Sequence, residues 1–380
     1  MTGDRPKFTT PRENIITQIS SFQRLLKNGH SLKNCTLQAL DFSNLQLNWE
    51  NFAIDNTLFL GCQMSLEDEM ALRRKGAFVY HAPDNLPYNP FRTNLYGWQE
   101  LMLQKDQKTK DLIIYEHFSS KRYNPTINEA LWQRIHDHAI DDALRQLLDF
   151  DEHGMTQRQC VAFMGGHSVS RTDPYYRKTV ETAKLLGEHG YFIASGGGPG
   201  IMEAANLGAY LAGLPQKAID EALTLLSAAP YYSDPAYHKA SLAVLEKFPQ
   251  GQENLAIPTW FYGHEPSNLF ASHIAKYFSN SIREDTLLAV ALYGIVFAPG
   301  SAGTTQEIFM DAAQNHYATF NYYSPMVFLG RYRYEVETMI YPLLRQLAHG
   351  KAYQELLYLT DEPAEVLAFL QEHGPMDKEA

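Results

Sequence analysis

The feature that most constrains the fold is a strand, glycine turn and helix unit near residue 300. An apolar run at residues 287–297 leads into APGSAGTTQE at residues 298–307, and an apolar-periodic segment follows at 308–313. A helix that begins on glycines presents free backbone N–H groups and the positive end of its dipole, and both suit a phosphate. The stretch therefore predicts an anion site at the start of this helix.

A second unit of the same kind lies earlier in the chain. A short apolar strand at residues 191–195 runs into GGGPG at residues 196–200, and a helix rich in small residues begins at Ile201. Consecutive glycines permit close backbone approach and positive φ, and Pro199 can precede a helix without cost. Two phosphate-sized turns in one domain predict a nucleotide ligand.

The remaining elements predict how these units are joined. Strands are expected at residues 158–164, 254–262 and 326–329, with helices at 174–189, 269–281 and 336–349. Such alternation implies parallel strands joined by right-handed crossovers, with ligands bound beyond the carboxyl ends of the strands. The predicted class is α/β, a Rossmann-like doubly wound parallel sheet, with an additional N-terminal α+β domain.

The N-terminal domain is expected to span residues 1–154 and the nucleotide-binding domain residues 155–380, with the boundary where a helix ends in DFDEHG. A period of five residues runs through Leu37, Phe42, Leu47, Phe52, Thr57 and Cys62, which resembles a short pentapeptide-repeat coil. Glu50 and Asp55 fall where such a coil prefers small residues. Irregular strands with a chance period are the alternative, and the role of this domain stays open.

Composition and missing motifs exclude several classes of function. The net charge of −11 argues against nucleic acid as a partner. The histidines show no metal-ligand spacing, so no metal is expected, and the absence of G-x-G-x-x-G argues against NAD, so no cofactor is expected. The three cysteines lack CxxC spacing, and no apolar run is long enough to cross a bilayer. We expect a cytoplasmic protein without a membrane partner.

Taken together, the glycine turns resemble the Lonely Guy (LOG) family of nucleoside 5′-monophosphate phosphoribohydrolases. The resemblance covers about residues 160–374 and is carried by residues 163–168, 175–190, 196–205 and 299–307. The last of these approximates the family hallmark P-G-G-x-G-T-x-x-E. The resemblance implies a Rossmann-like homodimer or higher homo-oligomer that hydrolyses the N-glycosidic bond of a nucleoside 5′-monophosphate to free base and ribose 5-phosphate.

The resemblance assigns catalysis to Glu307, the last residue of the hallmark, and to Arg283, which lies 16 positions before Pro299. An oxocarbenium-like transition state calls for a carboxylate near the anomeric carbon, and an arginine can hold a carboxylate or a phosphate. From the residues alone, two plainer interpretations stay open. Thr304-x-x-Glu307 is also a capping box, and a lone arginine is usually exposed at a helix end.

The resemblance also predicts substrate- and phosphate-binding residues on three loops. These are Gly166 and Ser168 after the first strand; Gly196, Gly197, Gly198, Gly200 and Glu203 in the second unit; and Gly300, Ser301, Ala302, Gly303 and Thr304 in the hallmark.

Two departures from the family pattern motivate an alternative function. Ser301 replaces the second glycine of the hallmark, and Glu284-Asp285 follows Arg283 where a basic residue is usual. The alternative is a nucleotide-binding or sensing protein that does not cleave its ligand. An amino-acid decarboxylase is disfavoured because no lysine in a pyridoxal phosphate setting can be identified.

Overall fold

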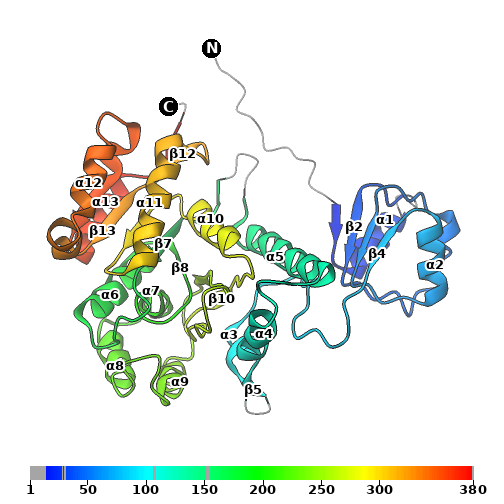
Figure 1. Cartoon of the computed structure of the whole chain (residues 1–380), viewed down its shortest axis with the longest axis horizontal. Coiled ribbons are helices and arrows are strands. Elements are labelled where there is room, and N and C mark those ends of the chain that lie inside the picture. Colours follow the sequence, from blue (N-terminus) through cyan, green and yellow to red (C-terminus); the bar gives the residue numbers. More distant parts are fainter. Residues whose placement is uncertain (1–13, 28, 30, 106–107, 151–154, 379–380) are drawn as a thin grey trace. The chain divides into compact units, whose positions relative to one another are not determined.

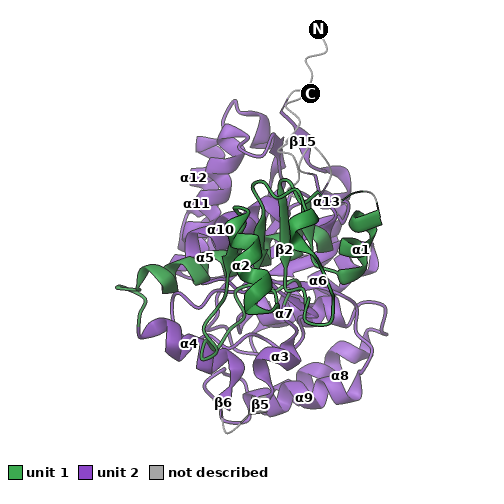
Figure 2. Ribbon diagram, turned by 90° about the vertical axis from the view of Figure 1, so that its right-hand side faces the viewer, with its two compact units in different colours: residues 1–95, 121–147 green, residues 96–120, 148–380 purple. Residues whose placement is uncertain are grey.

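The computed structural model describes residues 14–27, 29, 31–105, 108–150 and 155–378 (Figure 1). The chain divides into two compact units, which Figure 2 colours separately. The first comprises residues 1–95 and 121–147, and the second comprises residues 96–120 and 148–380.

The first unit contains a four-stranded parallel sheet in the order β1-β2-β3-β4. Its strands are β1 (Asn14–Ile16), β2 (Cys35–Gln38), β3 (Leu58–Leu60) and β4 (Phe78–Tyr80). Its helices are α1 (Ile19–Lys27), η1 (Trp49–Asn51), α2 (Leu66–Arg74) and most of α5 (Ile127–Leu148). Since every strand pair is parallel and helices lie between strands along the chain, this unit is α/β rather than the expected α+β.

The core of the first unit is aromatic. Phe22, Phe42, Trp49, Phe52 and Phe59 are buried and pack ring against ring, with the Trp49 and Phe52 centroids 4.9 Å apart. The five-residue rhythm falls largely on this core, because several of its members are buried: Leu37, Phe42, Phe52, Thr57 and Cys62. Side chains of this size account for much of the apolar surface that so small a sheet can bury.

Residues 96–120 belong with the second unit although they precede helix α5. This segment contains α3 (Trp98–Met102), β5 (Gln104–Lys105), β6 (Lys108–Thr109) and α4 (Lys110–Ser119). Tyr96 pairs with Ile274, and the Trp260 indole donates a 2.9 Å hydrogen bond to Asp111. A single boundary at residue 154 therefore does not describe the chain, which passes between the units more than once.

The second unit is built on a seven-stranded sheet in the order β10-β9-β8-β7-β11-β13-β14. All its neighbouring strands are parallel. The strands are β7 (Cys160–Met164), β8 (Phe192–Ser195), β9 (Leu255–Ala256), β10 (His273–Ile274), β11 (Ile295–Phe297), β13 (Met326–Leu329) and β14 (Leu357–Thr360). The sheet is the doubly wound, Rossmann-like arrangement that the sequence predicts.

Helices connect these strands. They are α6 (Pro174–Glu188), α7 (Ile201–Tyr210), α8 (Lys217–Leu226), α9 (Tyr237–Lys247), α10 (Asn280–Val290), α11 (Ala302–Tyr317), η2 (Tyr332–Glu337), α12 (Ile340–Leu347), η3 (Ala352–Leu356) and α13 (Pro363–Glu372). A small antiparallel pair, β12 (Tyr322–Tyr323) and β15 (Met376–Asp377), completes the unit. Across the described part of the chain, no helix combines the length and apolar character that a membrane span needs.

Strand order identifies where a ligand would bind. From the central strand β7 the chain first builds outward through β8, β9 and β10, and then returns to build the other half through β11, β13 and β14. The switch point lies between β7 and β11, which pair in register at Phe163 and Val296. In open α/β sheets the crevice beyond the carboxyl ends of the strands at such a point is the usual ligand site.

Candidate functional site

The loops that follow β7 and β11 meet at this switch point. The Gly166 N–H donates to the Pro299 carbonyl at 3.1 Å. A Cβ on Gly300 would lie 2.8 Å from the Gly166 nitrogen and would collide with the Thr304 hydroxyl. Only a glycine permits this approach, so the hallmark glycine brings the two predicted loops together.

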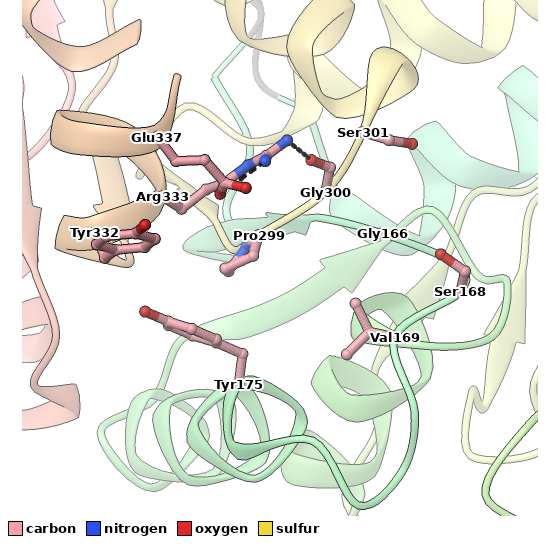
Figure 3. A pocket seen from close by; sticks show the side chains of 10 residues that line it. All are labelled: Gly166, Ser168, Val169, Tyr175, Pro299, Gly300, Ser301, Tyr332, Arg333 and Glu337. Atoms are coloured by element: carbon pink, nitrogen blue, oxygen red, sulfur yellow. Dashed lines mark hydrogen bonds and ion pairs between the residues drawn. The ribbon is translucent and has the colours of Figure 1, made fainter. Parts of the chain in front are cut away.

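Beside the loops lies a cavity of about 340 Å³, a size found among small-molecule sites. Figure 3 shows Tyr175 of α6 and Tyr332 of η2 at one end, with Ser168 and Ser301 at the other. Four of the predicted binding residues are among those that line it: Gly166, Ser168, Gly300 and Ser301. The remaining lining residues are Val169, Pro299, Arg333 and Glu337.

The first turn of α11 opens next to this cavity. The helix begins at Ala302, directly after Ser301, and residues Ala302 and Gly303 are exposed whereas Thr304 is buried. The first N–H groups of a helix have no partner within it, so this turn offers donors and a positive dipole end to an anion. The predicted anion site is thus open to a ligand.

The residue at which α11 begins also tests whether Thr304 and Glu307 form a capping box. A capping box would need Thr304 at the N-cap, but the N-cap is Ser301, and its side chain makes no capping hydrogen bond. Glu307 consequently lies in the second turn, ~7.5 Å along the axis from Ala302 at 1.5 Å per residue. The capping interpretation of Glu307 is therefore wrong, and its carboxylate is available for another role.

That carboxylate pairs with the arginine that the resemblance selected. Arg283 Nη1 lies 3.1 Å from Glu307 Oε1, and Arg283 Nε donates to the Ile257 carbonyl at 2.7 Å. The Arg283 side chain is 9% exposed and that of Glu307 16% exposed. The interpretation of Arg283 as a surface arginine is wrong, because α10 turns it inward towards the hallmark helix.

The pKa of Glu307 is raised above its ordinary value. Burial is the largest cause; the Arg283 charge acts in the opposite direction, and the nearby Glu284 and Glu265 charges raise the pKa further. Glu284 is held in place by hydrogen bonds from Gln306 at 3.0 Å and Tyr262 at 3.3 Å. The Glu284 that departs from the family pattern thus tunes the proposed catalytic carboxyl.

The second glycine turn is built differently from the first. All residues from Gly196 to Gly200 are buried, and a Cβ on Gly196 would lie 2.5 Å from Arg283 Nη2. Gly200, with φ of 67°, could carry no side chain without colliding with the Gly166 carbonyl. The first N–H of α7, from Ile201, already donates to that carbonyl at 3.1 Å. This turn packs against the arginine and the neighbouring loop rather than forming a second open cradle.

Glu203, expected among the binding residues, is fully buried in an ion pair. Arg171 donates to both its carboxylate oxygens, at 2.5 and 2.8 Å, and the Tyr176 hydroxyl adds a 2.8 Å hydrogen bond. Arg171 also stacks on the Tyr237 ring, 3.4 Å from its centroid. Since its oxygens are occupied and no part of it is exposed, Glu203 supports the α7 end of the turn and does not face a ligand.

Two residues that the sequence did not single out hold the hallmark turn. Arg333 donates to the Gly300 carbonyl and pairs with Glu337 at 2.9 Å, as Figure 3 shows. The buried Tyr334 hydroxyl donates to the Ala298 carbonyl at 2.7 Å. Both belong to η2, a single π-helical turn, and such turns are frequent at functional sites. No motif in the sequence marks these residues, because their partners are more than thirty positions away.

Within the described residues, no group of three or more histidine, cysteine, aspartate or glutamate side chains is arranged to hold a metal ion.

Neither a protein-family model nor a curated protein sequence matches the chain. Solved structures do match. The molybdenum cofactor binding protein from the phototrophic bacterium Rippkaea orientalis is 12% identical over 57% of this chain and 97% of its own, with a TM-score of 0.37. The Moco carrier protein from Chlamydomonas reinhardtii is 15% identical over 57% of this chain and 97% of its own, with a TM-score of 0.35. The structural-genomics target TM1055 is 14% identical over 57% of this chain and all of its own, with a TM-score of 0.34.

Such low identities and TM-scores carry no conclusion about ligand or activity. The assignment to the Rossmann-like class rests on the strand order and parallel pairing of this chain itself.

Proposed function

We propose that the protein is a cytoplasmic nucleosidase that hydrolyses nucleoside 5′-monophosphates to free base and ribose 5-phosphate. The observation that carries this proposal is the ion pair between Arg283 of α10 and Glu307 of α11, the helix whose first turn opens beside the cavity. The resemblance to the LOG family points to the same two residues.

The proposed binding mode places the 5′-phosphate at the first turn of α11. Gly300, Ser301, Ala302 and Gly303 would surround it, with Gly166 and Ser168 on the opposite wall. Anions are stabilised at a helix N-terminus by free N–H groups and the dipole. The sugar would then extend along α11 towards Glu307, one turn further on.

The chemistry follows from the position of Glu307. As the C1′–N bond breaks, positive charge develops on the sugar and the base leaves with the bonding electron pair. The Glu307 carboxylate stabilises this cation and orients a water, whose oxygen bonds to C1′ while its proton ends on the departing base. Arg283 keeps the carboxylate in position, and its charge opposes the rise in the pKa of Glu307 that burial causes.

The direct test is to incubate the purified protein with a panel of purine and pyrimidine 5′-monophosphates and to detect free base by chromatography. Wild-type protein should release base, whereas Glu307→Gln should lower kcat by at least ~100-fold, the scale of a lost electrostatic contact to the transition state. The variant should still bind nucleotide, which a rise in Tm would report. A fully active Glu307→Gln protein would contradict the mechanism.

The second candidate is a nucleotide sensor that binds without cleaving. It is favoured by Glu284, whose charge opposes ionisation of Glu307, and by Ser301 in the hallmark turn. This candidate predicts that a nucleotide raises Tm while no base appears. Binding of none of the nucleotides would exclude both functions.

The family resemblance further implies a homodimer, which we include in the proposal. Light scattering would show a particle of twice the 43.2 kDa chain mass, and a monomeric particle would contradict it.

A further inference from the structure

A carboxylate that the sequence analysis did not select lies over the second glycine turn. A Cβ built on Gly198 would lie 3.2 Å from Glu265 Oε2, just as a Cβ on Gly196 would lie against Arg283. The Glu265 charge is also one of those that raise the pKa of Glu307. Glu265 and the Arg283–Glu307 pair therefore surround the same short stretch of backbone.

The loop that carries Glu265 is hydrogen-bonded both to the glycine turn and to the buried Lys276. Asn268 donates to the Gly197 carbonyl from its backbone N–H at 3.0 Å and from its side chain at 3.1 Å. Lys276 Nζ donates to the Glu265 carbonyl at 3.3 Å and to the Ser267 hydroxyl at 3.2 Å.

Lys276 is itself fixed. Its side chain is 1% exposed and forms a 2.7 Å ion pair with the fully buried Asp111, which also accepts a hydrogen bond from the Trp260 indole. The Lys276 ammonium thus hydrogen-bonds to the loop from the buried side. The position of Glu265 beside the glycine turn is therefore fixed by the buried network of Lys276, Asp111 and Trp260.

The carboxylate of Glu265 nevertheless remains available to a ligand. Its side chain is 38% exposed. Among the described residues, the one basic group within 4 Å of its carboxylate oxygens is the His167 imidazole, whose Nδ1 lies 3.8 Å from Oε1, beyond hydrogen-bond distance. A negative charge here repels a phosphate but accepts hydrogen bonds from hydroxyl groups. The chemistry of this position suits a sugar.

We propose that Glu265 accepts a hydrogen bond from the ribose 2′-hydroxyl and thereby selects ribonucleotides over 2′-deoxyribonucleotides. The inference rests on the proposed function: with the phosphate at α11 and C1′ at Glu307, the 2′-carbon is the neighbour of the reacting carbon. A carboxylate that binds a ribose hydroxyl is a known solution in nucleotide-binding α/β folds. Hydrogen bonds to the 2-hydroxyl strengthen in oxocarbenium-like transition states, so the effect should appear in kcat as well as in KM.

The test compares kcat/KM for ribo- and 2′-deoxyribonucleoside 5′-monophosphates of the same base. Wild-type protein should prefer the ribonucleotide by about 10- to 100-fold, as expected for one hydrogen bond to a charged group. Glu265→Ala should bring this ratio close to one by losing activity on the ribonucleotide alone. Glu265→Gln, which keeps a neutral acceptor, should give an intermediate ratio.

Glu284→Gln is the matched control, because Glu284 also acts on Glu307 by its charge but is held by Gln306 and Tyr262. Its ribo-to-deoxy ratio should equal that of wild type. Equal cleavage of both sugars by wild-type protein, or an unchanged ratio in Glu265→Ala, would overturn the inference and leave the nucleosidase standing. Absence of base release from every nucleotide would overturn the nucleosidase and this inference with it.

Discussion

At the scale of single residues, the proposed site depends on how carboxylates are surrounded. Glu307 is paired with Arg283, Glu284 receives hydrogen bonds from neutral donors, and Glu265 has no such donor among the described residues. The negative charges of Glu284 and Glu265 oppose the ionisation of Glu307, whereas the Arg283 charge favours it. The protonation of Glu307 should accordingly respond to a change in either neighbour.

Glu284→Gln should shift the acidic limb of the pH–rate profile. In the proposed mechanism Glu307 acts as a carboxylate. Its pKa is raised by burial and by the Glu284 and Glu265 charges, and Arg283 opposes this rise, so activity should fall as the pH drops through that raised pKa. Removing the Glu284 charge lowers the pKa of Glu307, and kcat should therefore persist to lower pH.

Asp285→Asn is the control for this shift. Asp285 is the next residue along α10, but its charge is not among the largest causes of the raised pKa of Glu307. Its acidic limb should coincide with that of wild type. A profile of Glu284→Gln that matches wild type would show that Glu307 is not the group that titrates.

At the scale of elements, two strand–turn–helix units with similar sequences differ in how exposed their glycine turns are. The turn at Gly300 leaves the start of α11 open beside the cavity, whereas the turn at Gly196–Gly200 is buried beneath Arg283 and Glu265. In the first turn Gly300 permits the close approach of two loops, and Gly303 has open space around it. The glycines of the second turn serve close packing. Substitution by alanine should separate these roles.

Gly200→Ala should destabilise the protein by at least ~2 kcal/mol. Gly200 has φ of 67° and ψ of −131°, a region that only glycine enters readily, and the added Cβ would collide with the Gly166 carbonyl. Gly303→Ala is the matched control, since nothing lies within 4 Å of its Cβ position inside α11. Alanine there should leave stability unchanged or raise it by up to ~1 kcal/mol. Urea unfolding of both variants measures the difference, and equal stabilities would contradict the assigned roles.

At the scale of the whole molecule, the chain builds its second unit from two separate stretches. The segment at residues 96–120 brings Asp111 into the ion pair with Lys276, on which the loop of Glu265 depends. Burial works against the charged form of Asp111, but attraction to Lys276 and His264 outweighs it and holds its pKa below the ordinary value. This contact ties residues 96–120 to the strands that carry the site.

Asp111→Ala should destabilise the second unit by about 3–5 kcal/mol, because it leaves the Lys276 charge buried without its partner. Lys110→Ala is the control: Lys110 pairs with Glu100 at 2.6 Å on the exposed surface, where such a pair contributes at most ~1 kcal/mol. Thermal unfolding should separate the two variants clearly. Since the pKa of Asp111 is depressed, its contribution is present at neutral pH and is lost on acidification through that pKa, so the Asp111→Ala deficit should shrink in acid.

Much of the fold could be predicted from the sequence, because strands, glycine turns and helices are encoded in contiguous residues. The apolar strands, the turn at Gly300 and the alternation that gives a doubly wound sheet are all local patterns, and the structure confirms the class. The family resemblance added Arg283 and Glu307, 24 positions apart, which the structure brings within 3.1 Å.

Only the tertiary structure decided what depends on contacts between distant residues. The Arg171–Glu203 ion pair, 32 positions apart, removes Glu203 from the candidate site, and Arg333 reaches Gly300 from 33 positions away. Lys276 donates a hydrogen bond to the Glu265 carbonyl, and its buried charge is paired with Asp111, which comes from a stretch before α5. The sequence by itself determined the elements and their chemistry, whereas packing of distant side chains decided which glycine turn is open and which carboxylates are buried in ion pairs or left exposed.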